Sequence, residues 1–247
     1  MSGSYTSQDA LDIAKAMNHK IPQDSIAAFA CDTVQNIIWT RYPWAWTMGT
    51  LTAITCVDGT QDYSISNTDF YRLSVFQPPR IVRTDLTPVE YRELNVKQHL
   101  GVELTLKGGL ETIRNISYEP EISKVRLDFA ASVPSGTTLQ IQGPYQKKPT
   151  RITADTLTTA LTQPDHYFQV FLEGVRWKLY ELADDPRAGA LRTDKEQNTA
   201  YTGQLGSFMN ALADMAAAED LGDGEDPAFP STPLGYSKDA FFPRILG

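Results

Sequence analysis

The sequence is poor in residues that usually mark a metal site or a disulfide framework. Its 247 residues include two cysteines and three histidines. No His-x-x-x-His or Cys-x-x-Cys pattern occurs, so no local metal motif is present. Cys31 and Cys56 either form a disulfide or act as two small buried residues. We favour the second alternative, which is typical of a chain made in a reducing cytoplasm.

Long apolar runs are also missing. Charged side chains interrupt the first 21 residues, so no signal peptide is expected. No stretch approaches the roughly 20 apolar residues that are needed to span a bilayer. We therefore expect no membrane partner.

Positive charge is scarce, because 22 Lys and Arg face 30 Asp and Glu, which gives a net charge of −8. Affinity for nucleic acid comes mostly from Lys and Arg that neutralise phosphates. The chain should therefore not grip DNA or RNA over a broad surface, although it can still surround DNA without holding it.

Two helices are predicted at the N-terminal end. The first covers residues 7–20 and opens with a capping-box pair, Thr6 and Asp9, and the second covers residues 24–42. Both carry apolar residues at helical spacing. These are Ala10, Ile13, Ala14, Met17 and Ile21 in the first helix, and Ile26, Phe29, Ala30, Thr33, Val34, Ile37 and Ile38 in the second.

Short strand-like segments follow between about residues 48 and 150. Asp58-Gly59 is a turn signal between two of them, and Lys107-Gly108-Gly109 is also typical of a turn. A short helix is predicted at Pro88–Leu94, because Thr87 and Glu90 form a capping box. The predicted strands cover residues 51–56, 61–65, 70–76, 124–129 and 138–142.

Helical spacing returns after Pro164. One helix is predicted to end at Asp185-Pro186, and a long final helix is predicted from Thr193 to Leu221, closed by Gly222. The apolar positions are Phe168, Phe171, Leu172, Val175, Leu179 and Leu182 in the first of these helices, and Tyr201, Leu205, Phe208, Met209, Leu212 and Met215 in the last.

These patterns predict an α+β fold. Because neither pair of terminal helices makes a satisfactory core alone, we expect a helical bundle formed by the N- and C-terminal helices, with an inserted antiparallel β-rich domain and an extended C-terminal arm. The expected parts are the N-terminal helices of the bundle at 1–46, the β-rich insertion at 47–152, the C-terminal helices at 153–221 and the arm at 222–247.

No catalytic, metal or cofactor site is predicted. His19, His99 and His166 are far apart in sequence, and we expect them to face solvent or cap helices rather than join a triad. Asp184-Asp185 is either a catalytic pair or a C-terminal helix cap or intersubunit contact, and we favour the cap or contact. The acidic run at 220–226 lacks the ligand spacing of a calcium loop. The chain is not expected to be an enzyme.

Two clusters allow more than one interpretation. Trp39, Tyr42, Trp44 and Trp46 either stack on sugar rings or fill the joint where the second helix meets the sheet, and we favour the joint. The basic residues at 147–151 either touch phosphate or an acidic neighbour, or mark a solvated strand end, which is the simpler account.

The C-terminal arm is predicted to dock on another chain. Between Gly222 and Gly247 it carries four Pro and four Gly, which resist both helix and central strand. It is nevertheless rich in large apolar residues, which disordered tails usually lack. The predicted docking residues are Phe229, Leu234, Tyr236, Phe241, Phe242, Ile245 and Leu246.

Several segments resemble the head-to-tail adaptor, or connector, proteins of short-tailed bacteriophages, also described as tail tubular protein A. They are WTRYPWAW at 39–46, DGTQDY at 58–63, DFYRL at 69–73 and YELADDPRAG at 180–189, followed by the long final helix. The likeness spans most of the chain as architecture and recurring segments, and no single motif is diagnostic.

The resemblance implies a homo-oligomeric ring, usually a dodecamer, bound under the portal protein at the head-tail junction of the virion. Such a ring is assembled in the host cytoplasm, gives the tail nozzle or tail tube a docking surface and lets DNA pass without specific binding. The family is not catalytic and needs no cofactor, and its C-terminal segments often reach the portal.

A second hypothesis is a carbohydrate- or receptor-binding β module on a helical stalk. It depends on Trp44, Trp46, Tyr63, Phe70 and Tyr71 being available to a ligand. A third hypothesis, a hydrolase, has little support because nothing pairs a nucleophile with a base.

Overall fold

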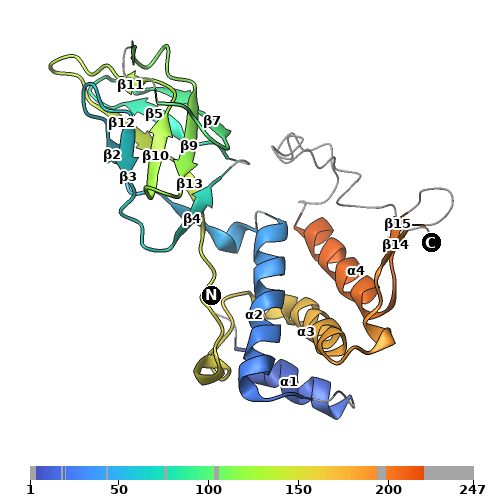
Figure 1. Ribbon diagram of the computed structural model, residues 1–247. Helices are drawn as coiled ribbons and strands as arrows, with labels where there is room; N and C mark the ends of the chain where they lie inside the picture. Colours follow the sequence, from blue (N-terminus) through green and yellow to red (C-terminus); the bar gives the residue numbers. More distant parts are fainter. Residues whose placement is uncertain are drawn as a thin grey trace. The chain divides into compact units, whose positions relative to one another are not determined.

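The computed structural model describes residues 4–17, 19, 21–42, 44–74, 77–102, 106–193 and 199–219. The chain divides into two compact units. The helical unit joins the described residues up to Trp46 to those from Pro149 onward, and the β unit is Thr47–Lys148. Figure 1 shows both units.

The helical unit contains four α-helices among its described residues. They are α1 (Ser7–Ala16), α2 (Asp24–Arg41), α3 (Phe168–Leu182) and α4 (Gly203–Ala218). Short 3₁₀ helices lie at Ala154–Thr156, Asp165–Tyr167 and Pro186–Ala188, and a hairpin of β14 (Leu191–Thr193) and β15 (Thr199–Tyr201) precedes α4. The helices α2 and α3 were both predicted, and the capping box of Thr6 and Asp9 is confirmed.

The predicted helical bundle is wrong. The fold is mixed α+β, with these four helices and several antiparallel sheets in the described part of the chain, and the helices run in different directions in Figure 1. The helix α3 packs against α1, α2 and α4. The helix α1 stops at Ala16, and α4 covers only Gly203–Ala218 of the predicted range from Thr193 to Leu221.

The final helix begins at Gly203 rather than Thr193 because a hairpin occupies the intervening residues. Gly189 and Gly203 close the base of this hairpin with φ values of 76° and 60°, which favour glycine. A Cβ on Gly189 would lie 1.7 Å from the carbonyl oxygen of Thr202. The chain segments at Gly189 and Thr202 are therefore too close for any side chain at Gly189, and positive φ values do not fit an α-helix. The helix can begin only after this contact.

The β unit consists of short strands. They are β1 (Met48–Thr50), β2 (Ile54–Thr55), β3 (Asp62–Ser64), β4 (Phe70–Leu73), β5 (Arg80–Arg83), β6 (Glu90–Glu93), β7 (Asn95–Lys97), β8 (Lys107–Gly108), β9 (Asn115–Glu119), β10 (Lys124–Leu127), β11 (Ala130–Ala131), β12 (Leu139–Gln142) and β13 (Pro144–Lys147).

Most strand pairs in the β unit are antiparallel. The sheets have the orders β1-β13-β4, β3-β10-β9-β7, β2-β12-β5-β6 and β11-β8. Two pairs, β7 with β9 and β8 with β11, are parallel, so the predicted purely antiparallel insertion needs correction. Lys107-Gly108 is one of these parallel strands, and the predicted turn begins only at Gly109.

The predicted helix at Pro88–Leu94 is wrong, because β6 occupies this segment. β6 pairs antiparallel with β5 in the register that places Arg80 opposite Glu93. The Arg80 guanidinium also lies 4.7 Å from the centre of the Tyr91 ring. Cross-strand hydrogen bonds and side-chain pairs have therefore overridden a local capping signal, which is a weak preference by comparison.

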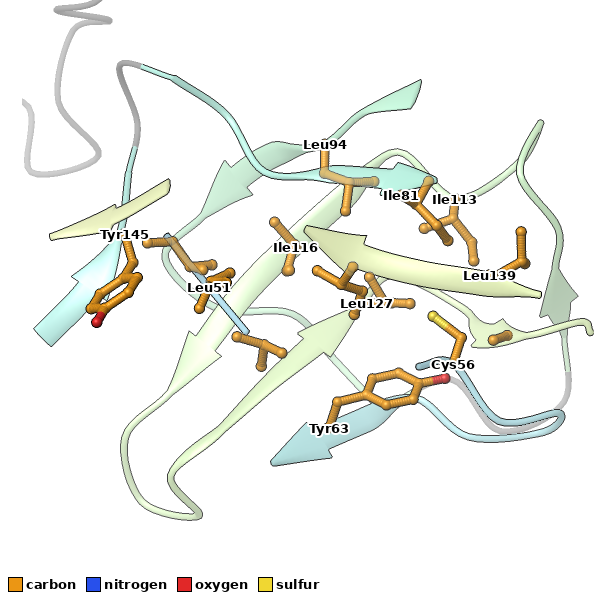
Figure 2. Close-up of a cluster of buried hydrophobic side chains, with 14 residues drawn as sticks. Leu51, Cys56, Tyr63, Ile81, Leu94, Ile113, Ile116, Leu127, Leu139 and Tyr145 are labelled. Atoms are coloured by element: carbon orange, nitrogen blue, oxygen red, sulfur yellow. The ribbon is translucent and has the colours of Figure 1, made fainter. Parts of the chain in front are cut away.

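The core of the β unit is built from alternate positions of these strands. Figure 2 shows inward-facing side chains from several sheets meeting in one cluster. Cys56 lies within it beside Tyr63, and both Cys56 and Cys31 are free and buried, which confirms the favoured interpretation of the two cysteines. The labelled members are Leu51, Cys56, Tyr63, Ile81, Leu94, Ile113, Ile116, Leu127, Leu139 and Tyr145.

The N-terminal segment is tied to the start of α3. Asp165 accepts hydrogen bonds from the backbone and side chain of Ser4 at 2.6 and 2.8 Å. The rings of Tyr5 and Phe168 stack with centres 4.2 Å apart. These contacts join residues about 160 positions apart, so the N-terminal segment and the segment that leads into α3 belong to one unit.

We predict that Gly174→Ala destabilises the helical unit. Ala is normally preferred over Gly inside a helix by about 1 kcal/mol. Here the new Cβ would lie 2.4 Å from Val34 Cγ1 and 2.8 Å from Phe208 Cε2, so overpacking should dominate. We expect a net loss of about 1–3 kcal/mol of unfolding free energy, measured by urea titration of the helical circular-dichroism signal.

The matched control is Gly101→Ala, because a Cβ there meets nothing within 4 Å. It should leave the unfolding midpoint nearly unchanged. Equal stability of the two variants would show that α3 does not approach its neighbours as closely as described.

Candidate functional site

A buried polar network lies on one face of the sheet β3-β10-β9-β7. Arg126 of β10 stands opposite Asp62 of β3 and Ser117 of β9, so the three side chains share that face. The Arg126 Nε and Nη2 atoms bind the two Asp62 carboxylate oxygens at 2.6 and 3.0 Å. The third nitrogen, Nη1, donates to the carbonyl oxygen of Leu100 at 3.0 Å.

Glu119 extends this network. Its carboxylate accepts hydrogen bonds from Ser117 Oγ and from the Leu100 backbone N–H, and it lies 2.7 Å from His99 Nδ1. Burial alone would raise the pKa of Glu119, but these hydrogen bonds outweigh it and lower the pKa. Glu119 is therefore an ionised anchor for the loop that carries His99 and Leu100.

The order of these groups does not match a hydrolytic triad. A serine nucleophile needs an imidazole within reach to accept its proton, with the acid behind the imidazole. Here the Glu119 carboxylate lies between Ser117 and His99, and Ser117 is fully buried. The network holds a loop against a sheet, and it offers no activated hydroxyl.

The second polar cluster surrounds His19 in the helical unit. His19 is only 6% exposed, its ring lies 4.2 Å from that of Tyr180, and Arg176 Nε approaches its Nε2 at 3.4 Å. Burial, followed by the charges of Arg176 and Arg187, lowers the pKa of His19 below 6.5. The prediction that His19 faces solvent or caps a helix is therefore wrong.

The remaining histidines and the acidic pair lie apart. His166 is exposed, and its ring is tilted by 52° against that of Tyr167, while His99 is largely exposed beside Glu119. Asp185 is the N-cap of the 3₁₀ helix Pro186–Ala188, where its side chain accepts a hydrogen bond from the Arg187 backbone N–H, whereas a C-terminal cap was predicted and the C-cap of α3 is Ala183. Hydrogen bonds from Arg187 lower the pKa of Asp185 to about 2. Within the described residues, no group of three or more His, Cys, Asp or Glu could hold a metal ion.

The aromatic cluster is mostly internal. Trp39, Tyr42 and Trp44 are buried, and Trp44 Nε1 donates to the carbonyl oxygen of Ile38 at 2.6 Å. Trp46 meets Trp39 edge-on, with ring centres 5.0 Å apart. Trp39, Tyr42 and Trp44 are thus part of the packing of the helical unit, and they leave no open face for a sugar.

Other predicted residues have plainer positions. Lys147 ends β13, in agreement with a strand end. The acidic run at 220–226 lies outside the described residues. So do all seven predicted docking residues, Phe229, Leu234, Tyr236, Phe241, Phe242, Ile245 and Leu246.

No protein-family model matches this chain, and a comparison with curated proteins finds no significant match. The likeness to phage adaptors therefore stays a prediction from the sequence. None of the helices in the described ranges is both long and apolar enough to cross a membrane.

We predict that the helical unit loses stability in acid through His19. The unfolded chain protonates this imidazole as pH falls through 6.5, whereas the folded chain resists, so the unfolding free energy should fall below that pH. Urea midpoints at pH 7.5 and 5.5 should differ more for the native chain than for His19→Gln. His166→Gln, at an exposed site, should retain the native difference.

We also predict that Arg126→Ala destabilises the β unit by about 2–3 kcal/mol, because the Asp62 carboxylate, whose side chain is 30% exposed, loses both hydrogen bonds. The control is Arg80→Ala. Its ion pair with Glu93 is about half exposed (49% and 54%), so less than about 1 kcal/mol should be lost. Equal losses in chemical denaturation would contradict a special role for the buried pair.

Proposed function

We propose that this chain is a structural subunit of a homo-oligomeric ring, a dodecamer, that joins the portal to the tail of a short-tailed phage. The ring stands at the head-tail junction of the virion, continues the DNA channel and carries no catalytic activity. The resemblance of the segments at 39–46, 58–63, 69–73 and 180–189 supports the family, the ring and the portal as partner.

A role in assembly is supported mainly by one observation. Several apolar residues that were predicted to lie in the core are exposed. Helical periodicity assigns five large apolar side chains to core-facing stripes, yet they are exposed on the helical unit. Apolar surface that the monomer leaves uncovered is typical of contacts with other chains. The five residues are Ile13 on α1, Met17 at the C-cap of α1, Ile26 and Phe29 on α2, and Leu182 on α3.

The charge distribution supports a conduit. Residues 47–148 contain eleven acidic and eleven basic side chains, so the whole net charge of −8 belongs to the helical parts and the arm. An acidic lining lets DNA pass because it provides few cations for the phosphates. We propose that DNA is enclosed without specific binding.

The carbohydrate- or receptor-binding alternative has weaker support. Trp44 and Tyr63, two of the aromatic residues on which it depends, are buried. Tyr71 is exposed on β4, but one ring is a poor platform for a sugar.

Electron microscopy of the full-length protein, alone and mixed with the portal protein of the same phage, tests the proposal. We expect rings that cap the portal. A persistent monomer that does not bind the portal would contradict it.

A chain truncated after Leu221 tests the role of the arm in assembly. It should keep its helical circular dichroism and lose assembly, because the arm's apolar residues contact another chain. A truncated chain that unfolds would show instead that the arm completes the subunit's own core.

A further inference from the structure

An apolar strip crosses the helical unit where α2 and α3 pack together. Ile26, Phe29 and Leu182 are 43%, 55% and 42% exposed, although helical periodicity places all three on core-facing stripes. We call these three residues the apolar strip. Other residues of the predicted stripes, such as Val34 and Leu179, are buried. Ala27 and Ala30, at the same end of α2 as Ile26 and Phe29, are also buried, so Ile26 and Phe29 lie on a different side of that helix from its buried residues.

The packing of the two helices places the members of the strip near one another. A Cβ on Gly174 of α3 would touch Val34 of α2, and further along Lys178 Nζ lies 5.9 Å from the centre of the Phe29 ring. The contacts therefore run in opposite directions along α2 and α3. Ile26 lies one turn beyond Phe29, and Leu182 one turn beyond Lys178, on the same helix faces.

The chain leaves the helical unit far from this strip. Glu219, the C-cap of α4, accepts a hydrogen bond from the Tyr167 hydroxyl at the N-terminal end of α3. Leu182 is the last residue of α3, so the helix separates the two points by about 22 Å, at 1.5 Å for each of its 15 residues. The departure point of the arm and the strip are therefore different patches of one subunit.

The arm has the length and the side chains to fill such a strip on a neighbouring copy. Ten residues lead from Glu219 to Phe229, the first of its seven large apolar residues. Fully extended, they span at most about 36 Å. An acceptor strip and a donor arm on different patches make a heterologous contact, which closes into a ring when the rotation allows, whereas a contact between identical patches gives a dimer.

We propose that the apolar strip binds the C-terminal arm, residues 222–247, of a second copy of this chain. This inference rests on the proposed ring, and it assigns the arm to the neighbouring subunit rather than to the portal. Phe29, the most exposed member of the strip, is its main contact.

Crosslinking of full-length variants tests the assignment. Phe29→Cys and Phe242→Cys are prepared as separate chains and then mixed, since native Cys31 and Cys56 are free and buried. We expect a disulfide-linked dimer in the mixture that contains one chain of each kind. A double variant that carries both Phe29→Cys and Phe242→Cys on one chain is oxidised at high dilution. If a disulfide forms within its single chains and none forms in the mixture, the arm folds onto its own subunit and the proposal is overturned.

A charge substitution gives an independent measurement. Phe29→Glu should raise the protein concentration at which half the chains are assembled by at least about tenfold in analytical ultracentrifugation. The matched control is Val89→Glu, at an equally open apolar site of the β unit, which should change it less than about twofold. If Phe29→Glu assembles at the same concentration as the native chain, the proposal that the apolar strip binds the arm is overturned.

The two proposals can fail separately. Crosslinked assemblies that do not bind the portal would retain the strip and reject the adaptor function. Portal-bound rings in which Phe29→Glu has no effect would retain the adaptor function and reject the strip.

Discussion

The helical unit depends on the close approach of α3 to α2 and α4 at Gly174. A methyl group at this position would overlap both Val34 and Phe208, so the absence of a side chain sets the distance between the helices. α3 also packs against α1, and Asp165 at its start holds Ser4. Segments from the N-terminal and C-terminal parts of the chain therefore meet on one helix, and the β unit lies between these parts in the sequence.

Local signals predicted the parts of the fold in which no distant strand or turn competes. The capping box at Thr6 and the apolar spacing of α2 and α3 identified their helices within a few residues. The same kind of signal failed at Thr87, because pairing of β6 with β5 supplies more hydrogen bonds than a helix cap does. It failed again at Thr193, because the hairpin contact between Gly189 and Gly203 cannot be read from periodicity.

The polar networks were beyond prediction for a related reason. Arg126 stands out in the sequence as a charge between two apolar strand residues, but its partner Asp62 is 64 positions away. His19 is buried by Tyr180 and approached by Arg176, which is 157 positions away. Its lowered pKa therefore depends on tertiary packing that one sequence does not specify. Sequence reasoning could not separate a buried histidine from an exposed one.

The disagreement between periodicity and burial is itself informative. Periodicity shows that a helix face is apolar, but it does not identify what covers that face. On α2, Val34 and Ile38 of the predicted stripe are covered by the chain itself, while Ile26 and Phe29 are not. Phe29 and Ile38 are nine residues apart and therefore lie on opposite sides of the helix. The helical parts and the arm also carry the whole excess of negative charge, so copies of this chain repel one another. In the proposed assembly, the exposed apolar residues of α2 would provide a contact that does not depend on opposite charges.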